Sequence, residues 1–155
     1  MAPPRILIID DEPTLIFFME QSLAEDQEYL VDTAKSGEEA LAKLGTQGYD
    51  LIIVDFRLPD INGLKVIETA TQLQPGTLAI LMTAYGSQEV EKQAQRLEVW
   101  RYVVKPFSME EMKAIVREAL DAREKSATRE KSCSISEDGK ASQAVRSHSW
   151  TSVGF

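Results

Sequence analysis

The sequence contains a single cysteine and a single histidine among its 155 residues, and it has no long apolar run. The lone Cys133 excludes an intramolecular disulfide and fits a reducing cytosol. With His148 as the only histidine, a metal site built from several histidines is excluded as well. No apolar run approaches the roughly 20 residues that span a bilayer. The opening MAPPRILII lacks the pattern of a signal peptide, because its short apolar stretch runs directly into acidic residues.

Basic residues are fewer than acidic ones: the chain has 17 Lys and Arg and 25 Asp and Glu, for a formal net charge of −8. This balance argues against direct binding of nucleic acid. Apolar residues make up 43% of the chain, which is enough for a real core. From residue 123 the sequence becomes rich in serine and poor in apolar periodicity. We therefore expect a domain over residues 1–122 and a disordered or loosely docked tail over 123–155, where Trp150, Val153 and Phe155 could dock.

Short runs rich in Ile, Leu and Val alternate along the chain with segments of helical spacing. Such runs are typical of buried parallel strands. Ser36 with Glu39 and Ser108 with Glu111 form capping-box patterns at two helix starts. The expected strands cover residues 5–9, 29–34, 50–54, 78–82 and 101–104, and the expected helices cover 13–26, 36–44, 64–73, 87–97 and 108–123. Five successive β–α units predict a doubly wound α/β fold with helices on both faces of a parallel sheet.

Polar side chains follow four of these apolar runs: Asp10 and Asp11, Asp55, Thr83, and Lys105. In open parallel sheets, ligands bind outside the carboxyl ends of the strands. All five side chains should therefore share one crevice at that edge. Three carboxylates, a hydroxyl and an ammonium together could hold a divalent cation, offer a carboxylate nucleophile and neutralise a phosphoryl group.

The three carboxylates would repel one another, and a divalent cation relieves that repulsion. Mg²⁺ prefers hard oxygen ligands and keeps several waters, and Mn²⁺ is an alternative. Asp11 and Asp55 could bind the ion directly, Asp10 through a water, and the backbone carbonyl of Arg57 could add another oxygen. The plain alternative is that Asp10, Asp11 and Glu12 only cap the first helix. Asp55 at the end of a second, adjacent strand favours the metal site.

Asp55 ends the most apolar strand and is the best candidate nucleophile, because carboxylates can attack phosphorus to give an acyl phosphate. Lys105 would neutralise a phosphoryl charge and Thr83 would donate a hydrogen bond. Taken alone, Thr83 could be an ordinary strand-end threonine and Lys105 a solvated lysine. The Lys105–Pro106 sequence suggests a cis peptide bond that would aim the ammonium inward.

Together these residues resemble the receiver domain of two-component response regulators, of the chemotaxis-regulator type. The matching residues are Asp10-Asp11, Asp55, Thr83-Ala84, Lys105-Pro106-Phe107 and the loop over residues 58–63. The resemblance covers about residues 5–122. It implies a flavodoxin-like sheet with strand order 2-1-3-4-5.

The resemblance also implies roles. Asp55 would accept a phosphoryl group from a histidine kinase or phosphotransfer protein, with Mg²⁺ held by Asp10, Asp11 and Asp55. Thr83, Ala84 and Lys105 would bind the phosphoryl oxygens. Such a domain is not an enzyme acting on other substrates but a switch that catalyses its own phosphorylation and slow dephosphorylation.

Output in this family is coupled to an aromatic residue, here Tyr102, whose position depends on Thr83. In the absence of a phosphoryl group, an equally good interpretation is that Tyr102 is an amphipathic residue with its hydroxyl at the surface. The changed surface would be the fourth helix, fifth strand and fifth helix, which could form a homodimer or bind a downstream protein or fused output domain. The protein would be cytoplasmic, with no contact to membrane or nucleic acid.

Two features depart from the family pattern. The segment Leu97-Glu98-Val99-Trp100-Arg101 stands where many receivers have Gly-Ala, so Val99 and Trp100 form either an apolar contact surface or a part that folds back onto the domain. Arg57 and Tyr85 occupy positions that tune loss of the phosphoryl group. Both are bulky and could obstruct the attacking water, which predicts slow self-dephosphorylation.

The chain could be a stand-alone regulator or the receiver cut from a longer transcriptional regulator.

Two other functions fit the residues less well. A Mg²⁺-dependent aspartyl-phosphate phosphohydrolase would need a second acid two residues after Asp55, where Arg57 stands. A flavin-binding protein of this fold would need a phosphate-binding loop after the first strand, where Asp10 and Asp11 would repel a phosphate.

Overall fold

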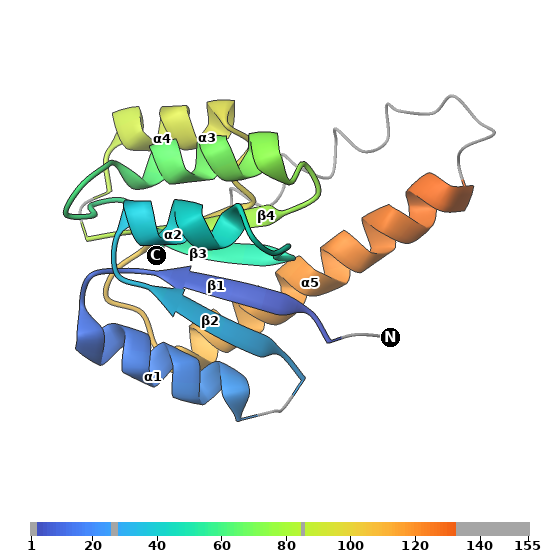
Figure 1. The fold of residues 1–155 in the computed structure, drawn as a ribbon, viewed down its shortest axis with the longest axis horizontal. Coiled ribbons are helices and arrows are strands. Elements are labelled where there is room, and N and C mark those ends of the chain that lie inside the picture. Colours follow the sequence, from blue (N-terminus) through green and yellow to red (C-terminus); the bar gives the residue numbers. More distant parts are fainter. Residues whose placement is uncertain (1–2, 26–27, 85, 133–155) are drawn as a thin grey trace.

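The computed structural model describes residues 3–25, 28–84 and 86–132. One five-stranded sheet in the order β2-β1-β3-β4-β5 forms the centre, and every neighbouring pair is parallel (Figure 1). The strands are β1 Arg5–Ile9, β2 Leu30–Ala34, β3 Leu51–Asp55, β4 Leu78–Thr83 and β5 Arg101–Val104. The helices are α1 Pro13–Ala24, α2 Gly37–Leu44, α3 Gly63–Leu73, α4 Gln88–Arg96 and α5 Met109–Ser132. The predicted doubly wound fold and strand order are confirmed.

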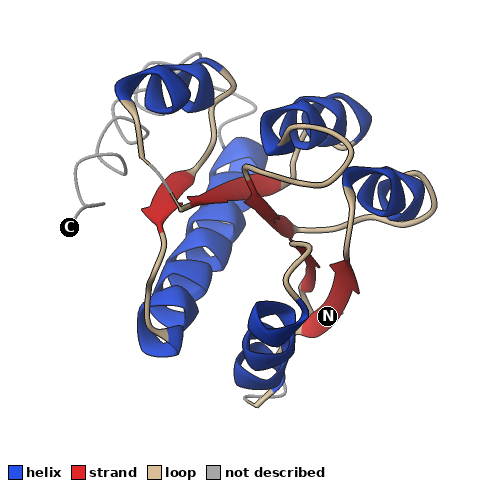
Figure 2. Ribbon diagram, turned by 90° about the vertical axis from the view of Figure 1, so that its left-hand side faces the viewer, coloured by secondary structure: helices blue, strands red, loops and turns tan. Residues whose placement is uncertain are grey.

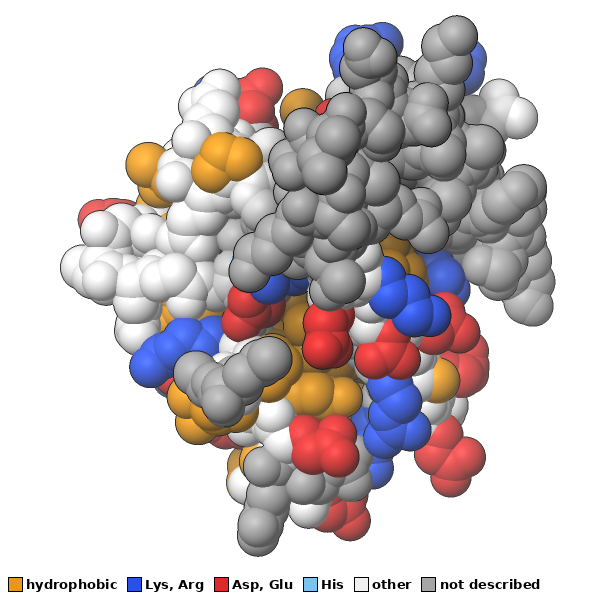
Figure 3. Space-filling model, turned by 90° about the vertical axis from the view of Figure 1, so that its right-hand side faces the viewer, with side chains coloured by type: hydrophobic (Ala, Val, Ile, Leu, Met, Phe, Trp, Pro, Cys, Tyr) orange, Lys and Arg blue, Asp and Glu red, His pale blue; other side chains and the backbone are white. Residues whose placement is uncertain are grey.

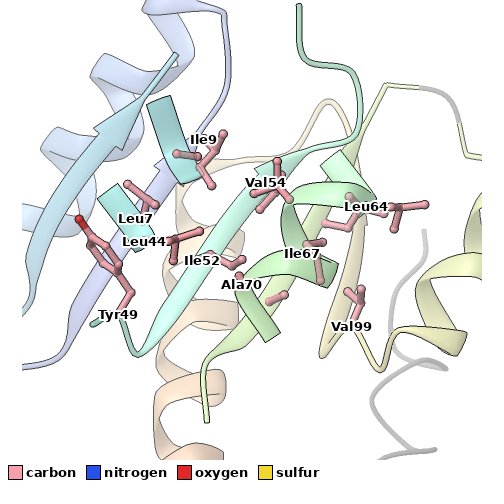
Figure 4. Packing of buried hydrophobic residues seen from close by; sticks show 14 of the residues in the cluster. Leu7, Ile9, Leu44, Tyr49, Ile52, Val54, Leu64, Ile67, Ala70 and Val99 are labelled. Atoms are coloured by element: carbon pink, nitrogen blue, oxygen red, sulfur yellow. The ribbon is translucent and has the colours of Figure 1, made fainter. Parts of the chain in front are cut away.

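Two apolar layers hold the helices against the sheet. Figure 2 shows α1 and α5 on one face of the sheet and α2, α3 and α4 on the other. Alternate residues of β3 belong to the two layers, because successive side chains of a strand point to opposite faces of the sheet. Ile52 and Val54 pack beneath α2 and α3 with Leu44 and Ile67 (Figure 4), whereas Ile53 packs on the α1 and α5 side.

Local sequence explains where several helices start. Pro13 occupies the first turn of α1. The Ser108 hydroxyl accepts the N–H of Glu111 at 3.0 Å, and the Glu111 carboxylate accepts the N–H of Ser108 at 3.3 Å, which completes the predicted capping box. Ser36 likewise caps α2 by accepting the N–H of Glu39 at 3.1 Å.

The last helix is longer than the sequence pattern indicated. We expected it to run to about residue 123 with at most a ragged extension, and α5 continues in regular form to Ser132 and extends past the sheet (Figure 1). Residues 124–132 lack apolar periodicity, yet their Glu, Lys, Ala and Arg residues have good intrinsic helix propensity. Arg123 fixes the helix where it leaves the domain, since Nη1 lies 2.6 Å from Asp50 Oδ1 and Nε donates to Gly76 O at 2.8 Å. The rest of the expected tail, residues 133–155, lies outside the described residues.

The segment before β5 corrects one expectation. Val99 is 2% exposed and packs in the core (Figure 4), and the partly buried Trp100 packs against the opposite layer. The Arg101 guanidinium carbon lies 4.6 Å from the centre of the Trp100 ring. An apolar contact surface formed by Val99 and Trp100 is therefore wrong, and the alternative that Trp100 folds back onto the domain holds.

Acidic and basic side chains are intermingled at the amino-terminal edge of the sheet, which Figure 3 views directly. Arg5 and Asp32 form one ion pair of this edge, at 3.8 Å. Within the described part of the chain, no helix combines the length and the apolar character needed to cross a bilayer.

Candidate functional site

The strand registers bring the predicted site residues to one edge of the sheet. Asp10 directly follows β1, whose last residue, Ile9, pairs with Val54 of β3. Asp55 is the last residue of β3, and Thr83 is the last residue of β4. Because parallel strands all point the same way, their ends lie side by side at the carboxyl edge.

The three carboxylates form a compact cluster. Asp10, Asp11 and Asp55 each offer an oxygen atom, and these atoms all lie within 4.8 Å of one another. Asp10 is fully buried and Asp55 is 7% exposed, whereas Asp11 faces solvent. Asp10 does not cap α1, because its Oδ1 accepts the N–H of Glu12, the residue before the helix, at 3.0 Å.

Lys105 reaches this cluster from the loop after β5. Its Nζ lies 2.9 Å from Asp10 Oδ2 and 3.5 Å from Asp55 Oδ2. Burial lowers the pKa of Lys105, but the hydrogen bond and charge of Asp10, together with Asp55, outweigh it and leave the pKa above its usual value. The Lys105–Pro106 bond is cis. The ammonium is thus charged and directed at the carboxylates, not solvated at the surface.

One ammonium does not balance the cluster. Burial, followed by the negative charge of Asp10, raises the pKa of Asp55 to about 6, although Lys105 and the backbone N–H of Arg57 oppose the rise. Hard oxygen donors from two strand ends, with excess negative charge, are the donor set that Mg²⁺ prefers. The residues present therefore fit a divalent cation at Asp10, Asp11 and Asp55.

An open pocket of about 450 Å³ lies over Asp55. It is lined by Asp11, Asp55, Phe56, Arg57, Thr83, Ala84, Gly86, Ser87, Val90 and Lys105. Of these residues, Thr83 is 3% exposed and Arg57 is exposed. The pocket thus brings together Asp55, Thr83, Ala84 and Lys105, and it leaves room above Asp55 for an incoming group.

Tyr102 lies inside the domain, not at its surface. The residue is 5% exposed, and its hydroxyl accepts the N–H of Ser87 at 3.3 Å. A Cβ on Gly86 would lie 3.1 Å from that hydroxyl oxygen, so the loop leaves little spare room beside the ring. Tyr102 therefore connects β5 to the loop between β4 and α4. Tyr85 lies outside the described residues.

Two glycines that sequence reasoning did not single out shape the site. A Cβ on Gly63 would lie 2.2 Å from the backbone oxygen of Asp55, so no side chain fits there. Its N–H donates to Phe56 O at 2.8 Å. Gly86, described above, is the other. The available signal for Gly63 was its place next to Asn62, four residues after the turn-forming Pro59.

Comparison with known proteins agrees with this arrangement. Residues 6–117 match the family described as "Response regulator receiver domain". The match covers more than half of the chain, and the chain belongs to this family. It is the receiver domain of a two-component response regulator.

Two curated relatives show the same likeness. The chain is 38% identical over 116 residues to the response regulator ArlR of Staphylococcus aureus, a stretch that is 75% of this chain and 52% of that protein. It is 34% identical over 116 residues to the regulatory protein AtoC of Escherichia coli K12, which is 75% of this chain and 25% of that protein. The chain thus spans about half the length of ArlR and about a quarter of the length of AtoC.

Solved structures extend the likeness to the fold. A CheY-like receiver domain protein from Methanospirillum hungatei JF-1 aligns with a TM-score of 0.77 at 32% identity, covering 81% of this chain and 99% of that one. The response regulator TrrA of Thermotoga maritima, solved in complex with Mg²⁺–BeF, aligns with a TM-score of 0.67 at 36% identity, covering 76% of this chain and 99% of that one.

Proposed function

We propose that Asp55 is the phosphoacceptor and that it receives its phosphoryl group from the phosphohistidine of a sensor histidine kinase or phosphotransfer protein. The observation that carries the proposal is the position of the Asp55 carboxylate. It ends the central strand at the floor of an open pocket, beside Asp10 and Asp11 and 3.5 Å from Lys105. The buried Asp10 is worse placed as a nucleophile, because it accepts hydrogen bonds from Lys105 and from the N–H of Glu12 and does not line the pocket.

The reaction exchanges one bond to phosphorus for another. An Asp55 carboxylate oxygen attacks the phosphorus, the new O–P bond forms, and the P–N bond to the imidazole of the donor breaks, with the electron pair and a proton going to the imidazole nitrogen. Lys105 neutralises charge on the transferred group, and the hydroxyl of Thr83 and the backbone of Ala84 hold its oxygens. Mg²⁺, or Mn²⁺, bound by the three aspartates and the carbonyl of Arg57 would supply further charge neutralisation.

We infer that the phosphoryl group then biases an equilibrium at Thr83. A hydrogen bond from Thr83 to the group would hold this side chain toward Asp55 and favour the inward position of Tyr102. The inward ring and its bond to Ser87 support this view. The affected surface is α4, β5 and α5, which could bind a downstream protein, a fused output domain or a second copy of the chain.

The cellular location and the mode of signalling are part of the same proposal. A cytoplasmic location and signalling by protein contacts, without membrane or nucleic acid, fit the proposal. The greater length of ArlR and AtoC is compatible with an output region outside this chain. The self-catalysed phosphorylation from small phosphodonors is part of the proposal, since the cation site and Lys105 belong to this domain.

Intact-mass analysis tests the proposal. The protein is incubated with a small phosphodonor and Mg²⁺, with an excess of chelator in a parallel sample. We expect one hydroxylamine-labile phosphoryl group with Mg²⁺, none with chelator and none in Asp55→Asn. Labelling of Asp55→Asn to the wild-type level would contradict the proposal. Sizing with and without beryllofluoride would then report any change in assembly.

A further inference from the structure

The loop between β3 and α3 carries Arg57 and is attached at its tip to a different helix. We propose that Asp60 is a positioning residue that ties this loop to the amino terminus of α2, and so couples the cation site to that helix. The inference rests on the proposed function, because it takes Mg²⁺ as the ligand of Asp10, Asp11 and Asp55.

The attachment is made by one carboxylate with three donors. Asp60 Oδ1 accepts the N–H of Gly37 at 2.9 Å and that of Ile61 at 3.0 Å. Asp60 Oδ2 accepts the N–H of Glu38 at 2.8 Å. Gly37 and Glu38 are the first residues of α2, so Asp60 satisfies two N–H groups that the helix itself cannot. The N–H groups of Gly37 and Glu38 also hold the pKa of Asp60 below its usual value.

A second contact fixes the same junction. A Cβ on Gly37 would lie 2.3 Å from Cγ1 of Ile61 and 3.3 Å from Oδ1 of Asp60. The loop therefore presses directly on the start of α2, with no room for a larger residue between them. The apolar contact of Ile61 and the hydrogen bonds of Asp60 both hold the loop against the first residues of α2.

The base of the loop is closed as well. Arg57 and Asn62 form an isolated antiparallel bridge, and the N–H of Gly63 donates to Phe56 O at 2.8 Å. Only four residues lie between the bridged pair, and Asp60 is one of them. Because the loop is this short, a displacement of Asp60 should also displace the backbone of Arg57.

Coupling of this kind is reciprocal. If the position of Arg57 contributes to cation binding, Mg²⁺ should slow amide hydrogen exchange at Gly37 and Glu38, which belong to another element. Loss of the Asp60 carboxylate should weaken Mg²⁺ binding, because residues that orient a ligand set typically affect metal affinity by about tenfold or more.

The test compares two ways of weakening the same helix start. Asp60→Ala removes the attachment to the loop. Ser36→Ala removes the local cap, in which Ser36 Oγ accepts the N–H of Glu39 at 3.1 Å, and leaves the loop attached. Asp60→Asn keeps the size of the side chain and one acceptor oxygen. The Mg²⁺ dissociation constant is measured by NMR titration, together with exchange rates of the Gly37 and Glu38 amides.

We expect about tenfold weaker Mg²⁺ binding in Asp60→Ala, an intermediate loss in Asp60→Asn and wild-type affinity in Ser36→Ala. Mg²⁺ should protect the two amides in wild type and in Ser36→Ala but not in Asp60→Ala. Wild-type affinity in Asp60→Ala, or an equal loss in Ser36→Ala, would overturn the inference. Phosphorylation of wild-type Asp55 is scored separately, so that a wild type that accepts no phosphoryl group marks failure of the proposed function instead.

Discussion

Lys105 donates a 2.9 Å hydrogen bond to the fully buried carboxylate of Asp10, across 95 residues of sequence. The same Nζ lies 3.5 Å from Asp55. One ammonium thus serves two carboxylates, with Asp11 close by as a third. The site is therefore built with an excess of negative charge that costs folding free energy when no cation is bound.

Neutralising one carboxylate should stabilise the metal-free protein. In chelator at neutral pH, we expect Asp55→Asn to raise the free energy of unfolding by about 1 to 2 kcal/mol, because it removes a desolvated charge that Asp10 repels. Mg²⁺ should then stabilise wild type more than the variant. Urea unfolding followed by tryptophan fluorescence measures both. Asp121→Asn, an exposed change on α5, is the control, and a less stable Asp55→Asn in chelator would contradict this reading.

The inward position of Tyr102 depends on Gly86. Gly86→Ala would place a Cβ 3.1 Å from the Tyr102 hydroxyl oxygen and 3.4 Å from Cγ2 of Val104. We expect the ring to become more exposed, and nitration of Tyr102, followed by mass spectrometry, to become faster. Gly48→Ala is the matched control, since its Cβ would meet only Gln74 Oε1, at 3.9 Å. Equal nitration rates in wild type and Gly86→Ala would show that the ring tolerates the methyl group.

Arg57 should prolong the life of the acyl phosphate. Arg57 is exposed and lines the pocket over Asp55, and we expect its bulky side chain to obstruct an attacking water. Arg57→Asn should therefore shorten the lifetime severalfold, as measured by loss of the phosphoryl group after the donor is removed. Arg96→Asn, at the end of α4 and outside the pocket lining, should leave the lifetime unchanged. A longer lifetime in Arg57→Asn would reverse the assigned role.

Tyr49 gives a pH-dependent contribution to stability at the other edge of the sheet. Burial raises its pKa, the 2.7 Å hydrogen bond to Asp32 and the charge of Asp32 raise it further, and Arg5 lowers it slightly. A tyrosine with a raised folded pKa stabilises the fold fully below its unfolded value of about 10, and this contribution falls as the pH rises above it. We expect Tyr49→Phe to cost about 1 kcal/mol near neutral pH.

The stability difference between wild type and Tyr49→Phe should shrink at alkaline pH, and chemical unfolding at several pH values measures it. Comparison with the variant cancels the titration of other groups. A difference that stays constant above pH ~10 would show that the Tyr49 hydroxyl does not remain protonated in the fold.

The strands and the site edge could be predicted because both leave local signals. Buried parallel strands read as continuous apolar runs, and polar side chains directly after Ile9, Val54 and Met82 mark their carboxyl ends. The strand order came from the family resemblance, since the runs themselves do not specify which strands are neighbours. The capping boxes at Ser36 and Ser108 are equally local.

What could not be predicted depends on contacts between distant segments. Glu98 adopts a φ of 60°, and the N–H of Val99 bonds to Ala94 O at 3.0 Å, which turns Val99 into the core. Nothing in the local sequence marks that turn. Asp60 reaches α2 from 22 and 23 residues away, so its role is visible only in the folded chain. The continuation of α5 to Ser132 reflects the intrinsic helix propensity of its last residues, which have no apolar periodicity to mark them as helical.

Locating the acyl phosphate shows directly whether Asp55 is the phosphoacceptor. The protein is phosphorylated with a small donor and Mg²⁺ and then reduced with borohydride, which converts an aspartyl phosphate to homoserine. Peptide sequencing by mass spectrometry then identifies the modified position. We expect homoserine at position 55 and unmodified aspartate at positions 10 and 11. Homoserine at either of those two positions, or reduction in Asp55→Asn to the wild-type extent, would contradict it.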